Sequence, residues 1–141
     1  MKKTILALFL TLLATQAFAS GGDGQTCYSK NPNAASEKDA YAEYEGQLVL
    51  SISHEGGEGK QGIWASLEVK GAKGKDESNY IASFGKVTYR HEKSSGLEHF
   101  SGKDRGKILD VRAEAKSGDG VMRYTDVDGK IKSVEVRCYQ D

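Results

Sequence analysis

Residues 48–70, LVLSISHEGGEGKQGIWASLEVK, decide the fold that we expect for this chain. In residues 48–53, and again in residues 63–70, apolar side chains recur at every second position. A strand turns successive side chains to opposite faces of a sheet, so this period places one face against a core and the other in solvent. Several glycines separate the two segments and mark a turn. The stretch therefore predicts two half-buried β-strands joined by a loop.

Strand-like segments continue to the C-terminus, and breaks that contain glycine separate them. Asp119-Gly120 and Asp128-Gly129 are two of these breaks, and glycine suits them because it accepts a positive φ at little steric cost. The segments are residues 80–84, 86–92, 97–100, 107–115, 121–125 and 130–139. Short strands at this spacing predict an all-β fold, an antiparallel meander of about seven strands. With almost no helix to cover its apolar face, such a sheet closes as a small barrel or packs as a sandwich, and the sequence leaves both open.

The segment before these strands, residues 20–46, has a different character. Residues 20–33 are rich in glycine and polar residues and contain the only proline of the chain, so we expect an irregular arm. Residues 36–45, SEKDAYAEYE, begin with a serine that resembles a helix cap and place two tyrosines on one face of a short helix. A strand over residues 40–45 fits nearly as well. We expect this arm and helix to belong to one domain with the β-rich part, residues 47–141.

Residues 1–19 have the features of a cleavable secretory signal peptide. Two lysines precede an apolar run in residues 5–13, and Ala17-Phe18-Ala19 supplies the small side chains of a cleavage site. The run is well short of the roughly 20 residues that cross a bilayer. Ser20, not a cysteine, follows the cleavage site, so we expect no lipid anchor. The sequence therefore predicts a periplasmic or secreted protein that begins near Ser20 and has no membrane anchor.

Acidic and basic residues are balanced. The chain has 20 of each, and loss of the two signal-peptide lysines leaves 18 basic residues and a net charge of about −2. Binding to nucleic acid requires a clustered basic excess that neutralises phosphates, and this chain has none. The composition therefore excludes nucleic acid as the expected partner, and an anionic membrane surface on the same grounds.

Cys27 and Cys138 are the only cysteines of the chain. In an oxidising compartment, two thiols near opposite ends of one domain predict a disulfide. The sequence has no CxxC spacing that would indicate a redox pair or a zinc site instead. We expect the bond to hold the N-terminal arm against the last strand and so protect the edge of the sheet.

One segment resembles part of a metal-binding loop. Residues 124–135 overlay the end of a calcium loop, but Tyr124 stands where the first carboxylate ligand is required. The flanking residues also alternate like strands. A hairpin that turns at Asp128-Gly129 is therefore the favoured interpretation.

The three histidines, His54, His91 and His99, each neighbour a glutamate. A three-residue hairpin loop at residues 94–96 would bring His91 and His99 opposite each other, where they could share a metal ion. A two-residue loop at residues 95–96 would instead pair opposite charges and leave the histidines apart. The register with the two-residue loop is electrostatically better, so we expect neither a metal nor another cofactor. If the three-residue loop forms instead, His91 and His99 are the candidate metal ligands.

Candidate ligand-binding residues lie on one strand and in the polar loops. Trp64 falls on the face opposite the apolar row, where it is either a second core contact, the favoured interpretation, or an exposed aromatic available to a ligand. Lys73, Lys75 and Arg105 lie in glycine-rich loops, and loops carry recognition in many β-domains. These four residues are our candidate ligand contacts.

The sequence contains no GxSxG, HExxH or spare cysteine for catalysis, so it predicts no catalytic residue. We expect an exported, non-enzymatic binding module whose partner is a protein or small molecule of the cell envelope or exterior, for instance an inhibitor of a secreted hydrolase or an envelope accessory protein. A lipocalin-like carrier is an alternative, with a cavity lined by positions such as Leu50, Leu67 and Val111. A small hydrolase or metal enzyme is a third, and it requires two of the histidines to converge.

Overall fold

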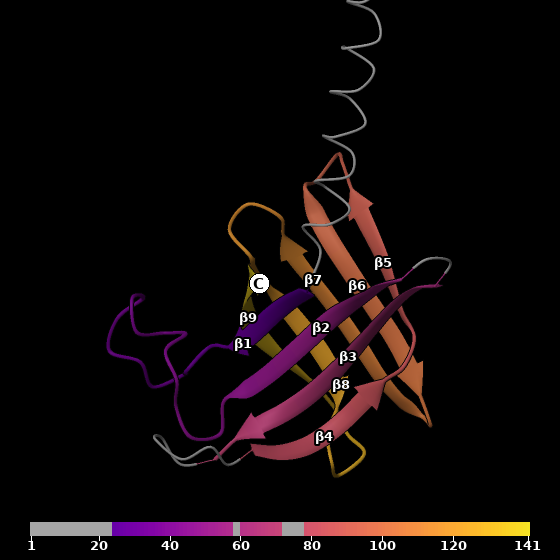
Figure 1. Cartoon of the computed structure of the whole chain (residues 1–141). Coiled ribbons are helices and arrows are strands. Elements are labelled where there is room, and N and C mark those ends of the chain that lie inside the picture. Colours follow the sequence, from indigo (N-terminus) through magenta and orange to yellow (C-terminus); the bar gives the residue numbers. More distant parts are fainter. Residues whose placement is uncertain (1–23, 58–59, 72–77) are drawn as a thin grey trace, which may run out of the picture.

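The computed structural model describes residues 24–57, 60–71 and 78–141. The expected signal peptide, residues 1–19, lies outside them. The described residues form nine β-strands and no helix (Figure 1). The strands are β1 (Gly24–Ser29), β2 (Leu48–Gly57), β3 (Lys60–Lys70), β4 (Ser78–Phe84), β5 (Val87–Glu92), β6 (Leu97–Asp104), β7 (Lys107–Glu114), β8 (Asp119–Thr125) and β9 (Ile131–Gln140). Within these ranges there is accordingly no helix that could span a membrane.

All nine strands belong to one antiparallel sheet with the order β4-β3-β2-β1-β9-β8-β7-β6-β5. The sheet curls into a nearly closed barrel, with β1–β4 on one side in Figure 1 and β6–β9 on the other. Near the seam β3 approaches β5 and β4 approaches β6, and the Lys107 ammonium donates a 2.8 Å hydrogen bond to the Ile81 carbonyl. The all-β, antiparallel prediction is confirmed, with a barrel as its form and nine strands in place of about seven.

The expected irregular arm is wrong for residues 24–29, which form β1. This strand pairs with β2 on one side and with β9 on the other, so it occupies the middle of the sheet. Its odd-numbered side chains point into the barrel, and Gln25, Cys27 and Ser29 are all buried. The prediction was wrong because two of the three inward-facing residues of β1 are polar, so the sequence shows no alternation of apolar and polar side chains there.

The expected helix in residues 36–45 is also wrong, and the segment forms successive turns. Its backbone bonds join residues three apart, such as the 3.2 Å bond from the Asp39 amide to the Ser36 carbonyl. The Ser36 hydroxyl donates to the Asp39 carboxylate instead of capping a helix. The Arg137 guanidinium lies over the ring of Tyr41, 4.3 Å from the ring centre. The Tyr44 hydroxyl forms a hydrogen bond with the Ser29 hydroxyl at the end of β1. Tertiary contacts in different directions thus override the local helical pattern.

The barrel interior is a packed apolar core. Leu50, Leu67 and Val111, the positions expected to line a carrier cavity, are completely buried in it. The register pairs Leu50 with Leu67 across β2 and β3, as the alternation in the sequence requires. Larger side chains such as Phe84 and Phe100 fill the space between the two sides of the barrel.

The predicted disulfide is present. Cys27 and Cys138 are joined across β1 and β9, where they are direct partners in the ladder. Because β1 is flanked by β2 and β9, the bond joins two central strands and does not protect an edge. It fastens the β1–β4 half of the sheet to the β5–β9 half.

Candidate functional site

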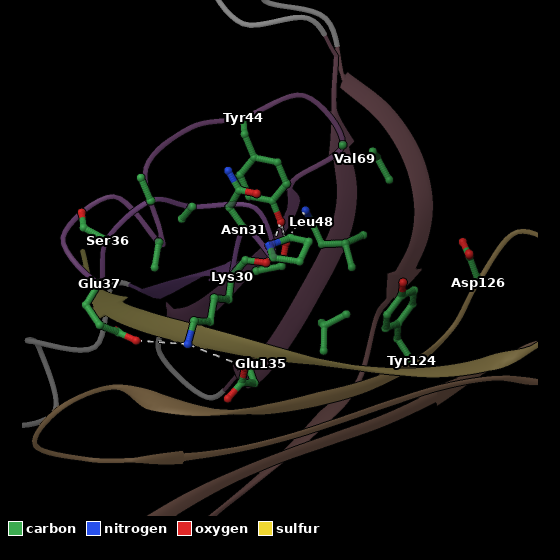
Figure 2. A pocket seen from close by; sticks show the side chains of 17 residues that line it. Lys30, Asn31, Ser36, Glu37, Tyr44, Leu48, Val69, Tyr124, Asp126 and Glu135 are labelled. Atoms are coloured by element: carbon green, nitrogen blue, oxygen red, sulfur yellow. Dashed lines mark hydrogen bonds and ion pairs between the residues drawn. The ribbon is translucent and has the colours of Figure 1, made fainter.

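A pocket of ≈970 Å³ opens at the end of the barrel where β2 begins and β8 ends. Strand residues form its base, and the segment between β1 and β2 forms a wall over it (Figure 2). We call this segment, residues 30–47, the mouth loop. Barrel mouths are common places for small-molecule sites, because the sheet gives a rigid apolar base and the loops supply polar groups.

The base of the pocket is apolar. Leu48 of β2, Val69 of β3, Tyr124 of β8 and Val134 of β9 line it. Leu48 and Val69 are cross-strand partners, and each of the four residues continues the inward-facing row of its own strand. The alternation that builds the core therefore also builds the base of the pocket, one layer beyond the last fully packed side chains.

Hydroxyl groups fasten the mouth loop to the end of β1. The Tyr44 hydroxyl donates to the Lys30 carbonyl at 3.0 Å and lies 2.8 Å from the Ser29 hydroxyl. A phenol has one proton to donate, so in this arrangement Ser29 donates to Tyr44. Ser29 in turn accepts a 2.9 Å bond from the Leu48 amide at the start of β2. The chain of bonds fixes both ends of the mouth loop.

Gln47 holds the loop from inside. Its side chain is 1% exposed, and its amide nitrogen lies 3.2 to 3.3 Å from the carbonyl oxygens of Ser29, Tyr41 and Ala42. A buried amide whose protons are all used resists movement, because each lost bond leaves an unpaired polar group. The pocket is therefore preformed.

The charged rim is dominated by carboxylates. On one side the Lys30 ammonium lies 3.2 Å from a Glu37 oxygen and 3.9 Å from a Glu135 oxygen (Figure 2). The hydrogen bond to Glu37 and the charge of Glu135 raise the pKa of Lys30, so it remains a cation. One lysine thus faces two carboxylates.

The opposite side repeats this arrangement. Asp126, which lines the pocket, forms an ion pair with Lys132, and Lys132 also lies 3.6 Å from Asp128. The hydrogen bond from Lys132 lowers the pKa of Asp126, against a smaller opposing effect of burial. Here too a single ammonium faces two carboxylates.

Tyr124 stands beside Asp126 with its hydroxyl group toward the pocket (Figure 2). Only 5% of the residue is exposed. Burial raises its pKa, and the negative charge of Asp126 adds to the effect. The phenol is therefore neutral near pH 7, and its hydroxyl is the part that faces a ligand in the pocket.

The functional groups of these lining residues are carboxylates, an ammonium, hydroxyls, an amide and apolar side chains. They include no histidine and no cysteine, and the Ser29 hydroxyl is committed to Tyr44 and Leu48. What they offer is apolar contact at the base, hydrogen bonding from tyrosine, and charge at the rim.

Two of the four candidate ligand contacts from the sequence, Trp64 and Arg105, fall within the described residues. Trp64 is 38% exposed on the outer face of β3, opposite Ser53 of β2, so the favoured core interpretation is wrong. Arg105 is an exposed residue in the turn between β6 and β7, with a φ of 50°. Lys73 and Lys75 lie outside the described residues. Neither Trp64 nor Arg105 lines the mouth pocket.

The β5–β6 hairpin follows neither register that we expected. It pairs Glu92 with Leu97 across a four-residue loop, so His91 faces Glu98 and His99 faces Arg90. His91 and His99 consequently lie on opposite faces of the sheet. His99 lies 3.2 Å from an Asp110 oxygen. In the part of the chain that the structure describes, no three His, Cys, Asp or Glu side chains gather in a way that could hold a metal ion.

The pocket itself was missed from the sequence. Its residues come from the mouth loop and from strands at both ends of the chain, and only the pairing of β1 with β9 brings them together. The one pocket residue that the sequence singled out was Tyr124, because a calcium loop would need a carboxylate at that position. The turn at Asp128-Gly129 was predicted correctly, and it joins β8 to β9.

Comparison with known proteins adds no relative: no family model, no curated protein and no solved structure matches the chain.

Proposed function

We propose that this chain is an exported, non-enzymatic binding protein that takes a small molecule in the pocket at the barrel mouth. The observation that carries the proposal is a preformed pocket with an apolar base, held open by the buried Gln47 and by the bonds between Ser29 and Tyr44. A site that is already ordered spends little binding energy on organising itself. Export is supported by the buried Cys27–Cys138 disulfide, a bond typical of oxidising compartments.

This proposal moves the ligand site of the carrier that the sequence analysis gave as the alternative function. Leu50, Leu67 and Val111 belong to the filled core, so a ligand would sit above them at the mouth. A protein partner is the competing form of a binding module, and it would use the exposed outer face of the barrel, where Trp64 lies.

The test is native mass spectrometry of the protein purified from its host with the disulfide intact. We compare wild type with Ala34→Trp, which places a bulky ring in the pocket, and with Ala115→Trp, a matched control on an exposed turn away from it. A bound small molecule at one per chain, lost in the first variant and kept in the second, supports the proposal. A ligand that survives Ala34→Trp, or a stoichiometric protein partner without any small molecule, contradicts it.

Export is tested by fractionation of the host cells. A mature chain beginning near Ser20 in the periplasm or medium is expected. A cytoplasmic chain that keeps residues 1–19 would refute this part of the proposal.

A further inference from the structure

The mouth pocket joins an apolar base to an acidic rim, and this combination restricts the ligand. Leu48, Val69 and Val134 provide a surface for a hydrocarbon body, and the ring of Tyr124 closes one side of it. Burial of such a body is favourable by about 25 cal/mol for each Å² removed from water. The apolar part of the ligand therefore supplies affinity, while the rim decides which polar group is accepted.

The rim carries an excess of negative charge on both sides. Lys30 is shared by Glu37 and Glu135, and Lys132 is shared by Asp126 and Asp128. Among the residues that line the pocket, the charged ones are one lysine and three carboxylates, Lys30 against Glu37, Asp126 and Glu135, with a formal charge of −2. Both lysines already contact carboxylates, so an incoming anion would compete with those ion pairs.

An anion that enters the pocket would leave water and meet this excess charge without gaining a cation. A cation would meet the second carboxylate oxygens of Glu37 and Glu135, because Lys30 contacts one oxygen of each. The Tyr124 hydroxyl, which faces the pocket, can also accept a hydrogen bond from an ammonium group.

We propose that the mouth pocket selects amphipathic organic cations, molecules with a hydrocarbon body and an amino group, over neutral and anionic molecules of the same size. The inference rests on the proposed function, since it names the ligand class of the same site.

Isothermal titration calorimetry with three probes of equal length tests it: n-octylamine, 1-octanol and octanoate, each titrated into the full mature protein. We expect octylamine to bind at least about tenfold more tightly than octanol, which corresponds to about 1.4 kcal/mol, and octanoate to bind most weakly. Octanoate or octanol binding as tightly as octylamine would overturn the inference while the proposed function stands. Failure of all three probes would overturn the proposed function, and the inference with it.

A charge variant isolates the role of the rim. Glu37 and Glu135 have exposed side chains, so the double variant Glu37→Gln/Glu135→Gln should fold. It is expected to lower octylamine affinity at least about threefold and to leave octanol affinity unchanged. Glu92→Gln, at the exposed end of β5 and at the opposite end of the barrel from the pocket, removes a charge and serves as the control. An equal loss for both ligands, or an equal loss in the control, would overturn the inference.

Discussion

Removal of the Cys27–Cys138 bond is expected to cost a large share of the stability of this domain. The cysteines are 111 residues apart, and closing a loop of this length in the unfolded chain corresponds to about 5 kcal/mol in the chain-entropy relation. Domains of this size are stable by roughly 5 to 15 kcal/mol in total. The double variant Cys27→Ala/Cys138→Ala should therefore fold marginally.

Urea unfolding followed by far-ultraviolet circular dichroism measures the effect. With a slope of about 2 kcal/mol/M for a domain of this length, the midpoint should fall by about 2 to 3 M. Reduced wild-type protein is the matched control, because it loses the covalent link but keeps both sulfur atoms, of which that of Cys27 is buried. Reduced protein and the double variant should unfold at similar urea concentrations.

The reasoning fails if reduction lowers the unfolding free energy by less than about 1 kcal/mol. Such a result would mean that the ladder between β1 and β9 keeps these strands paired without the bond, or that the unfolded chain is already compact. A larger loss in the double variant than in the reduced protein would assign the difference to packing of the sulfur atoms, since Cys27 is fully buried.

Three further predictions concern the mouth loop, two glycines and one carboxylate. Gln47→Leu should destabilise the protein by about 1 to 3 kcal/mol because buried carbonyl groups lose their donor, whereas Gln140→Leu, at an exposed position, should change the urea midpoint little. Gly118→Ala should cost more than about 3 kcal/mol, because its φ is 77° and a Cβ would collide with a backbone carbonyl of β9. Gly129→Ala, at a φ of 80° with open space around it, should lower the free energy of unfolding by only about 1 to 2 kcal/mol. Equal decreases in melting temperature for the Gly118→Ala and Gly129→Ala variants would contradict this difference. The Asp126 carboxylate has a folded-state pKa below 3.8, chiefly because a neighbouring ammonium donates to it, so it stabilises the protein above that pH and loses the contribution as the pH falls through the folded value. Asp126→Asn should therefore reduce the difference in unfolding free energy between about pH 7 and about pH 2, and an unchanged difference would show that this pair contributes nothing.

The sequence predicted those parts of the fold that depend on local periodicity. The alternation in residues 48–53 and 63–70 gave the correct inward row, which the pairing of Leu50 with Leu67 confirms. The disulfide and the turn at Asp128-Gly129 followed from residue chemistry alone. These signals share one property: the residues that determine them are neighbours, or are the only two of their kind.

What the sequence did not predict depends on contacts between distant segments. β1 was taken for an arm because Gln25 and Ser29 occupy inward positions, and these become acceptable only when the mouth loop and the far side of the barrel supply partners. Gln25, for example, donates to Glu98 at 3.1 Å. The hairpin register at β5–β6 was missed because the expectation weighed only charges across the two strands. In the structure β6 must also align with β7, where Phe100 pairs with Val111 in the core.

The position of β1 between β2 and β9 also has a kinetic consequence. A chain that is synthesised from its N-terminus makes β1 early, yet one of the two strands that pair with β1 is the last to be made. Pairing over such sequence distances raises the contact order and slows folding. Until β9 arrives, β1 keeps one unpaired edge and Cys27 is a free thiol without its partner. The barrel is therefore a structure that can be completed only after β9 has been synthesised.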